Sequence, residues 1–417
     1  MKPGISPLLN SVLMVTLLAV SLLSHPATAA PQFKILHTFG EGMDAGGLWS
    51  GLIFDDKGNL FGASAGGGVN RYGTVYELKP QPDGTWKEKI LHSFGFDDPD
   101  GFEPYDGVIR DKSGNLYATT SMGGAGGDRG TIFELSPSPG GWTLNVLYDF
   151  CIPPCSGAPG AAPNAGLFQD GSGNLYGVGA GVFELSSGEN GWTETNLHDF
   201  CTGNCYDGHV PGAGLISDAK GTLYGTTEFG GKHNKGTVYL VKQKRDGTWT
   251  EHVLHHFGGS QSDGVEPGIG RLAMDNAGNL YGTTAQGGKH RCGGGVFGCG
   301  TVFRLSLQPD GHWKQTILHN FKPGSEGNSP GAGVVLDAQG DLYGTAGQGG
   351  GPCRCGVVYK LSPNPDGSWA YTLLHTFNGD DGALPDANLI MDDQGNLYGT
   401  ASQGGPGTAG VAFEITP

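Results

Sequence analysis

Four short motifs recur along this chain in a fixed order, and that repetition constrains the fold more than any other feature. A Leu-(His/Tyr)-x-Phe motif returns at intervals of 50 to 64 residues, beginning at Leu36, Leu91, Leu147, Leu197, Leu254, Leu318 and Leu374. An Asp-x-x-Gly-(Asn/Thr/Asp)-Leu-(Tyr/Phe) motif begins at Asp55, Asp111, Asp170, Asp218, Asp275, Asp337 and Asp392. A Gly-(Thr/Val)-(Val/Ile)-(Phe/Tyr) motif and a turn followed by tryptophan complete the unit. Such a period indicates one structural unit that is used repeatedly.

Each unit is expected to form four short antiparallel strands, which we term A to D. In the first complete unit these strands cover residues 51–54, 60–64, 74–78 and 86–94. The Asp-x-x-Gly turn joins A to B, a Gly-Gly loop joins B to C, and a Pro-Asp-Gly turn joins C to D. Both turns carry glycine where the backbone requires a positive φ. Four strands in a unit of about 50–60 residues are typical of a β-propeller blade.

The two ends of the repeat region complement each other. Residues 33–39 form a strand D without the three strands that should precede it, whereas the last unit stops after its strand C at residues 411–415. Pairing of these two strands would complete a seventh blade and leave few free sheet edges. We therefore predict an all-β fold, a seven-bladed β-propeller closed by the N-terminal strand. A linear β-solenoid is the alternative.

The composition excludes several other classes of protein. The chain contains 79 glycines and 25 prolines in 417 residues, but no strict Gly-X-Y period, so it is not a collagen. Helical bundles are disfavoured because glycine costs about 1 kcal/mol at each helix position. An apolar content of 37 %, with 19 Phe, 14 Tyr and 7 Trp, favours a packed core over disorder. The net charge of −16, without a basic run, argues against nucleic acid as a partner.

The first 29 residues are predicted to be a secretory signal peptide. Lys2 precedes an apolar run over residues 8–23, and Ala27-Thr28-Ala29 forms a small-residue cleavage site. A membrane anchor is the alternative, although the run is short for a span of about 20 residues. Residues 30–417 then form one propeller domain. We expect this domain to be secreted or periplasmic and monomeric, with no further membrane span and no C-terminal anchor.

Eight cysteines occur as local pairs, namely Cys151 with Cys155, Cys201 with Cys205, Cys292 with Cys299, and Cys353 with Cys355. Export makes disulfide bonds the expected state. One residue separates Cys353 from Cys355, so pairing of either with Cys292 or Cys299 remains open. A zinc site is less favoured because it would prefer Cys-x2-Cys spacing with further ligands. We expect no metal and no cofactor.

These motifs resemble those of the GloVer (Gloeo/Verruco) tandem-repeat proteins, a family of exported bacterial proteins. The segments that carry the resemblance include residues 278–284, 300–303 and 197–201, the last followed by Asp207-Gly208. The resemblance covers about residues 33–417. It implies export and a repeat-built β fold, and it implies no activity. Many relatives carry a C-terminal surface anchor, whereas this chain ends at Pro417 without one.

Most motif residues are interpreted as architectural. A carboxylate at the Asp-x-x-Gly turn can accept backbone N–H groups. The motif histidines look at first like metal ligands, and they are His37, His92, His198, His255, His319 and His375, with Tyr148 in the remaining copy. They stand on the outermost strand of each blade, so they diverge around the rim and cannot share an ion about 2 Å from each ligand. We interpret these histidines and the recurrent tryptophans as packing between blades.

Candidate functional residues lie where loops depart from the repeat. The B–C loops, the D–A loops and all cysteines fall on one face of the predicted ring, and loops on a rigid scaffold commonly bind ligands. Over the fourth and fifth blades, histidine beside carboxylate and arginine could abstract a proton. The catalytic candidates are His209, His233, His290 and Arg271, of which Arg271 replaces a recurrent glycine. The ligand-binding candidates are Asp207, Asp263, Glu266, Lys232, Lys289 and Arg291.

Three functions follow from this sequence. The leading hypothesis is a secreted binding module for an extracellular glycan or a surface protein, since no Ser-His-Asp order, His-Glu-x-x-His, phosphate loop or EF-hand motif is found. The second is a lyase or hydrolase that acts on a polysaccharide or a cyclic ester through the histidine cluster. The third is a structural protein of the envelope or matrix, in which the candidate residues are ordinary solvated loop residues. The sequence leaves open whether the protein is an enzyme.

Overall fold

The computed structural model describes residues 30–40, 43–96, 98–125, 129–150, 163, 165–268, 270–292 and 298–417. Contacts divide the chain into a leading unit, residues 1–30, and the unit of residues 31–417 described below. The predicted signal peptide lies outside the described residues, and so does the predicted Cys151–Cys155 pair. No membrane-spanning helix is found in the described part of the chain.

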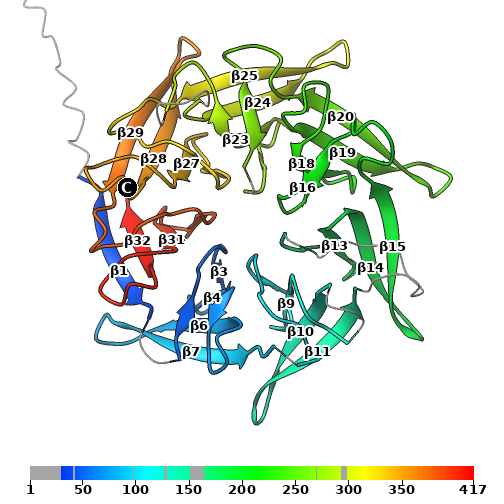
Figure 1. Cartoon of the computed structure of the whole chain (residues 1–417), viewed down its shortest axis with the longest axis vertical. Helices are drawn as coiled ribbons and strands as arrows, with labels where there is room; N and C mark the ends of the chain where they lie inside the picture. The colour runs from blue at the N-terminus through cyan, green and yellow to red at the C-terminus, as the bar shows by residue number, and fades with distance from the viewer. Residues whose placement is uncertain are drawn as a thin grey trace, which may run out of the picture. The chain divides into compact units, whose positions relative to one another are not determined.

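Seven four-stranded antiparallel sheets form a ring, which confirms the predicted seven-bladed β-propeller (Figure 1). From the innermost strand outward, blade 1 contains β3 (Ile53–Phe54), β4 (Leu60–Ser64), β6 (Thr74–Pro80) and β7 (Trp86–Ser93). Blade 2 contains β8 (Ile109–Arg110), β9 (Leu116–Thr119), β10 (Thr131–Ser138) and β11 (Gly141–Asp149). Blade 3 contains β12 (Phe168–Gln169), β13 (Leu175–Val178), β14 (Gly181–Gly188) and β15 (Gly191–Asp199).

The remaining blades repeat this order of strands. Blade 4 contains β17 (Ile216–Ser217), β18 (Leu223–Phe229), β19 (Thr237–Gln243) and β20 (Trp249–His256), and blade 5 contains β22 (Ala273–Met274), β23 (Leu280–Gly287), β24 (Thr301–Leu307) and β25 (Trp313–Asn320). Blade 6 contains β26 (Val335–Leu336), β27 (Leu342–Ala346), β28 (Val357–Pro363) and β29 (Trp369–Thr376). Short extra strands are β2 (Ala45–Gly46), β5 (Gly66–Gly67), β16 (His209–Pro211) and β21 (Gly264–Pro267).

The seventh blade combines the two ends of the repeat region. It contains β30 (Ile390–Met391), β31 (Leu397–Ala401), β32 (Val411–Thr416) and, outermost, β1 (Gln32–Thr38). β1 pairs antiparallel with β32, with Ile35 opposite Phe413, and Figure 1 shows these two strands side by side. The predicted closure of the ring is therefore confirmed.

The core lies between neighbouring blades, where two of the sequence motifs meet. The phenylalanine of each Leu-(His/Tyr)-x-Phe motif packs edge-on or tilted against an aromatic residue on strand C of the next blade. The pairs are Phe39–Tyr76, Phe94–Phe133, Phe150–Phe183, Phe200–Tyr239, Phe257–Phe303, Phe321–Tyr359 and Phe377–Phe413. Their ring centroids lie 4.8 to 5.4 Å apart. Such pairs stabilise an interface beyond the area they bury, and they explain why both motifs recur together.

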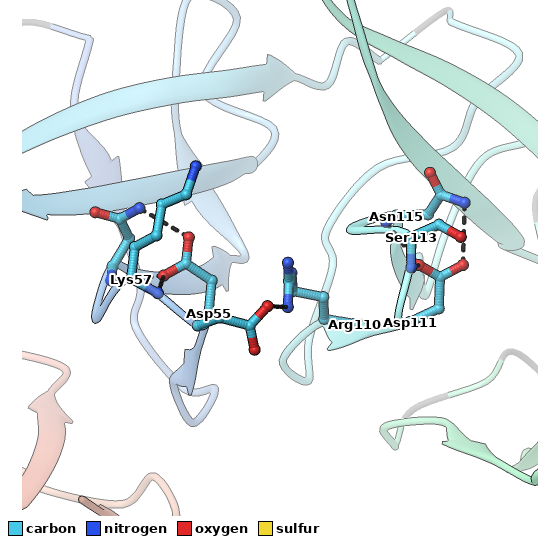
Figure 2. Close-up of polar contacts among 8 residues, drawn as sticks. Asp55, Lys57, Arg110, Asp111, Ser113 and Asn115 are labelled. Atoms are coloured by element: carbon cyan, nitrogen blue, oxygen red, sulfur yellow. Dashed lines mark hydrogen bonds and ion pairs between the residues drawn. The ribbon is translucent and has the colours of Figure 1, made fainter.

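The A–B turns are closed by the motif aspartates, as predicted. Asp55 Oδ1 accepts the backbone N–H groups two and four residues later at 2.8 and 2.9 Å, and Asp111 does the same in blade 2 (Figure 2). Between these turns Arg110 lies 3.3 Å from Asp56, and the two blades are thereby linked. The same capping bonds occur at Asp170, Asp218, Asp275, Asp337 and Asp392.

Candidate functional site

The D–A loops and the ends of strands B together build the loop face of the ring. In blades 4 and 5 the D–A loop forms an extra strand, so that β16 pairs with β18 and β21 with β23. Single bridges do the same elsewhere, between Phe102 and Met122, Asn328 and Gln348, and Ala383 and Gln403. The loops that enter blades 2, 4, 5, 6 and 7 are thus tied to their own blades, which gives this part of the face a defined backbone.

Five of the six motif histidines point at an acidic residue of the D–A loop that follows them, and the sixth, His37, lies 3.7 Å from Glu88 of the next blade. Strand D contains a β-bulge directly before this motif position in every blade (Tyr148 in blade 2, histidine in the others), and such a bulge re-aims the side chain. The histidine Nε2 lies 2.6 to 3.5 Å from a carboxylate oxygen in the pairs His92–Asp100, His198–Asp207, His255–Asp263, His319–Glu326 and His375–Asp381. The carboxylates of Asp207 and Asp263, two predicted ligand contacts, are engaged in these pairs.

The proline in the D–A loops that enter blades 2, 5, 6 and 7 packs against the preceding blade. A Cβ added at Gly300, which opens strand C of blade 5, would collide with Pro330, and Gly236 stands in the same relation to Pro267. The residue before the proline adopts a left-handed conformation, as Glu266 does with φ 55°. Its N–H donates to the carbonyl of Lys235 in the preceding blade at 3.1 Å. Loops that sequence reasoning assigned to ligand binding therefore also join neighbouring blades.

Arg271 reaches across the axis of the ring. It begins strand A of blade 5, yet its Nη2 donates to the carbonyl of Leu167 in blade 3 at 3.0 Å and lies 4.0 Å from Asp106 of blade 2. The glycines at the same position in blades 3 and 4, Gly166 and Gly214, provide the room, because a Cβ at either would collide with the guanidinium. The departure from the repeat thus has a structural explanation, since one arginine crosses space that glycines leave open.

A pocket opens on the axis at the loop face, and we call it the axial pocket. Its lining includes Trp49, Tyr105, Glu228, Asp386 and Asn388, and its volume is about 140 Å³. These residues come from blades 1, 2, 4 and 7, so the pocket exists only in the assembled ring. Trp49, Tyr105 and Asp386 stand in D–A loops, and Glu228 lies at the end of β18, next to the B–C loop.

A second cavity of about 220 Å³ follows deeper along the axis and is lined by strand A residues such as Leu52, Val108 and Leu389. Asp106 and Asn388 line both spaces, and Arg271 lines the deeper one. These three polar side chains therefore separate the axial pocket from the deeper cavity.

The axial pocket is lined by three carboxylates, of which Asp106 lies near Arg271 and the other two, Asp386 and Glu228, have no counter-charge among the described residues. Burial raises the pKa of Asp386 to about 6. Burial, and then the charge of Glu266, raise the pKa of Glu228. Within the described residues neither carboxylate forms a hydrogen bond or an ion pair. Titratable groups with shifted pKa values in a concave site are candidates for function.

The three candidate histidines are not brought together. His233 lies against Gly259 and influences the pKa of His256, at the outer edge of blade 4. The charge of His290 contributes to lowering the pKa of His319, which lies on the outermost strand of blade 5. His209 is exposed on β16, where it pairs with Phe229. None of the three lines the axial pocket or the deeper cavity.

The basic candidates are likewise peripheral. The backbone N–H of Lys232 donates to His256 and that of Lys289 to Asn320, the last residues of the outer strands β20 and β25. The side chains of Lys232, Lys289 and Arg291 are exposed. Of the charged residues predicted to act together over blades 4 and 5, Arg271 therefore lies on the axis, whereas the basic loop residues lie near the rim.

Three disulfide bonds lie in the described loops of this face, Cys201–Cys205, Cys292–Cys299 and Cys353–Cys355. They confirm three of the predicted local pairs. The open question about Cys353 and Cys355 is settled in favour of their own bond, because Cys292 and Cys299 pair with each other. Disulfide bonds fit an extracellular protein.

The residues of the axial pocket were missed by sequence reasoning, although a signal for them existed. Trp49, Tyr105 and Asp386 occupy one repeat position, two residues before the start of strand A, where blades 4 and 6 carry Gly212 and Gly331. Glycine fills this position in only two of the seven units, so the signal was weaker than the one that singled out Arg271.

The sequence pattern of the Gloeobacter/Verrucomicrobia repeat matches residues 24–189 and 179–413, so the chain belongs to this repeat family. A comparison with curated proteins finds no match. Among solved structures, an ancestral GH74 enzyme is similar with a TM-score of 0.54 and 11 % identity, over 88 % of this chain and 48 % of the enzyme. PorZ, a surface component of the type-IX secretion system of Porphyromonas gingivalis, is similar with a TM-score of 0.43 and 14 % identity, over 82 % of this chain and 43 % of PorZ. This chain thus spans about half the length of either protein.

Proposed function

We propose that this member of the Gloeobacter/Verrucomicrobia repeat family is an exported glycan-binding module, with its ligand site in the axial pocket. The observation that carries the proposal is the meeting of two aromatic side chains and two unpaired carboxylates in one concave site. Tyr105 is 43 % exposed at the pocket, and Trp49 lines it beside Asp386. Aromatic faces stack against the apolar faces of sugar rings, and carboxylates accept hydrogen bonds from hydroxyl or amino groups.

The charge of the pocket favours glycans that carry amino groups. Asp386 and Glu228 are partly buried without a counter-charge among the described residues, and burial of an unpaired charge is costly. An ammonium group of a bound sugar would pair with these carboxylates and could also lie over the face of Trp49 or Tyr105. The chain as a whole, at −16, attracts cationic and repels anionic polymers.

A glycan array probed with the full chain tests this proposal. We expect binding to polymers of glucosamine, with weaker binding to their N-acetylated forms and none to sulfated glycans. Trp49→Ala should reduce the signal at least about tenfold, which corresponds to about 1.4 kcal/mol. Tyr206→Ala is the matched control, because Tyr206 is 49 % exposed on the same face outside the axial pocket. Capture of a surface protein without any glycan signal would refute the glycan proposal, and no ligand at all would favour a structural role.

One observation favours a hydrolase as a second candidate. A carboxyl group with a pKa near 6, as burial gives Asp386, can act as a general acid close to neutral pH. Glycoside hydrolysis uses two carboxyl groups, and Glu228 is a second carboxyl group in the pocket that has no counter-charge among the described residues. In this hydrolase the carboxyl pair acts as the catalytic groups, in place of the predicted histidines, which lie apart. Release of reducing ends from a bound glycan, abolished in Asp386→Asn but not in the double variant His233→Ala with His290→Ala, would support it.

A further inference from the structure

The same three positions meet at each junction between blades. At the junction of blades 7 and 1 the residues at these positions are placed differently relative to one another. At a junction, the motif histidine and its loop acid face a residue two positions after the strand D tryptophan of the next blade. That position carries Glu251 at the junction of blades 3 and 4, and Gln315 at the next junction. At the junction of blades 7 and 1 it carries Glu88 on β7, which faces His37 of β1 and Asp44.

We propose that His37, Asp44 and Glu88 bind a divalent metal ion, with Zn²⁺ as the best match. One donor atom from each of the three lies within 4.8 Å of the others, and in the described part of the chain no other group of three His, Cys, Asp or Glu residues does so. Ligands about 2.0–2.2 Å from a shared Zn²⁺ lie roughly 3.3–3.5 Å apart in tetrahedral geometry. Small side-chain rotations would bring the three donor atoms from within 4.8 Å of one another to this shorter spacing.

The donor atoms are enclosed and directed at one another. His37 Nε2 is buried without a hydrogen-bond partner and lies 3.7 Å from Glu88 Oε2. The Glu88 side chain is 6 % exposed and that of His37 is 18 % exposed. The backbone N–H of Ala45 donates to Glu88 Oε1 at 3.1 Å, a contact of the kind that orients metal ligands from outside. An imidazole nitrogen without a partner, facing two carboxyl groups in a closed space, provides the donors that Zn²⁺ takes.

The junction of blades 3 and 4 provides an internal comparison. It contains the same residue types, His198, Asp207 and Glu251. There the histidine Nε2 is hydrogen-bonded to Asp207 Oδ2 at 3.1 Å, and the three donor atoms do not gather within 4.8 Å. Residue types alone therefore do not create the arrangement; the placement of His37 relative to Glu88 does. A metal at this place would fix β1, the strand that closes the ring, to the outer strand of blade 1.

Zinc titration of the full chain, after treatment with EDTA and desalting, tests the proposal. We expect one Zn²⁺ per chain by calorimetry, a higher melting temperature with Zn²⁺, and at least tenfold weaker binding of Ca²⁺ and Mg²⁺. Glu88→Gln should weaken Zn²⁺ binding at least tenfold, whereas Glu251→Gln, the matched change at the comparison junction, should not. Equal loss in both variants, or an unchanged affinity in Glu88→Gln, would overturn the proposal.

A second measurement does not depend on the variants. Crystals of the wild-type chain grown with Zn²⁺ should give an anomalous peak at the zinc edge between His37, Asp44 and Glu88. A peak at other residues and none at this site would overturn the proposal, even if Glu88→Gln failed to fold.

Discussion

Replacement of Asp386 by asparagine should stabilise the protein above pH 6. Burial raises the pKa of this carboxyl group from 3.8 to about 6. Between these pH values the folded chain keeps a proton that the unfolded chain releases, so the contribution is fully present below pH 3.8 and is lost as the pH rises through 6. The loss amounts to about 3 kcal/mol, at about 1.4 kcal/mol for each tenfold change in acidity. Asparagine stays neutral at every pH, so the variant does not lose this stability as the pH rises.

Thermal unfolding at pH 8 and at pH 3.5 measures this effect. For a cooperative unit of about 390 residues, 3 kcal/mol corresponds to a rise in melting temperature of about 4 °C. We expect this rise for Asp386→Asn at pH 8 and nearly equal melting temperatures at pH 3.5. Asp380→Asn, an exposed aspartate of the same loop, should change neither value. A variant that folds but is no more stable than the wild type at pH 8 would refute the view that this carboxylate is buried without compensation.

Further variants test the other parts of the account. Arg271→Ala should destabilise the ring by about 2 kcal/mol, measured by urea unfolding, because it removes a charged hydrogen bond between blades; an unchanged midpoint would show that the crossing is dispensable. Gly300→Ala should cost about 2 kcal/mol more than Gly311→Ala, since both have positive φ but only the former meets Pro330; equal costs would contradict the packing of that proline. Glu251→Gln should gain about 2 kcal/mol at pH 8 but not at pH 4, because burial and then the charge of a nearby aspartate raise the pKa of Glu251 from 4.5 to about 7; a gain independent of pH would contradict this cause.

The fold was predictable because its motifs are local and repeated. Asp55 caps its turn through backbone groups two and four residues away, so a seven-residue motif contains the whole interaction. Closure was also predictable, because a lone strand D and a missing strand D stand at opposite ends of the repeat region. The observed strand ends differ from the predicted ones by one or two residues. For example, β6 extends to Pro80, whereas the predicted strand ended at residue 78.

The candidate site was less predictable, because it depends on contacts between distant blades. Nothing near Arg271 in the sequence shows that its guanidinium reaches Leu167, 104 residues earlier. His233 and His290 follow identical Gly-Gly-Lys segments, which suggested proximity, yet equivalent positions in a ring are separated by the rotation between blades. The same rotation brings Trp49 and Asp386 into one pocket, although most of the chain lies between them.

Calorimetric titration tests most directly whether the axial pocket is a glycan site. Glucosamine oligomers should be titrated calorimetrically near neutral pH into the wild-type chain, Trp49→Ala and Tyr206→Ala. We predict saturable binding of one oligomer per chain, at least about tenfold weaker in Trp49→Ala and unchanged in Tyr206→Ala. Equal affinity in all three proteins would place the site elsewhere and contradict the central claim.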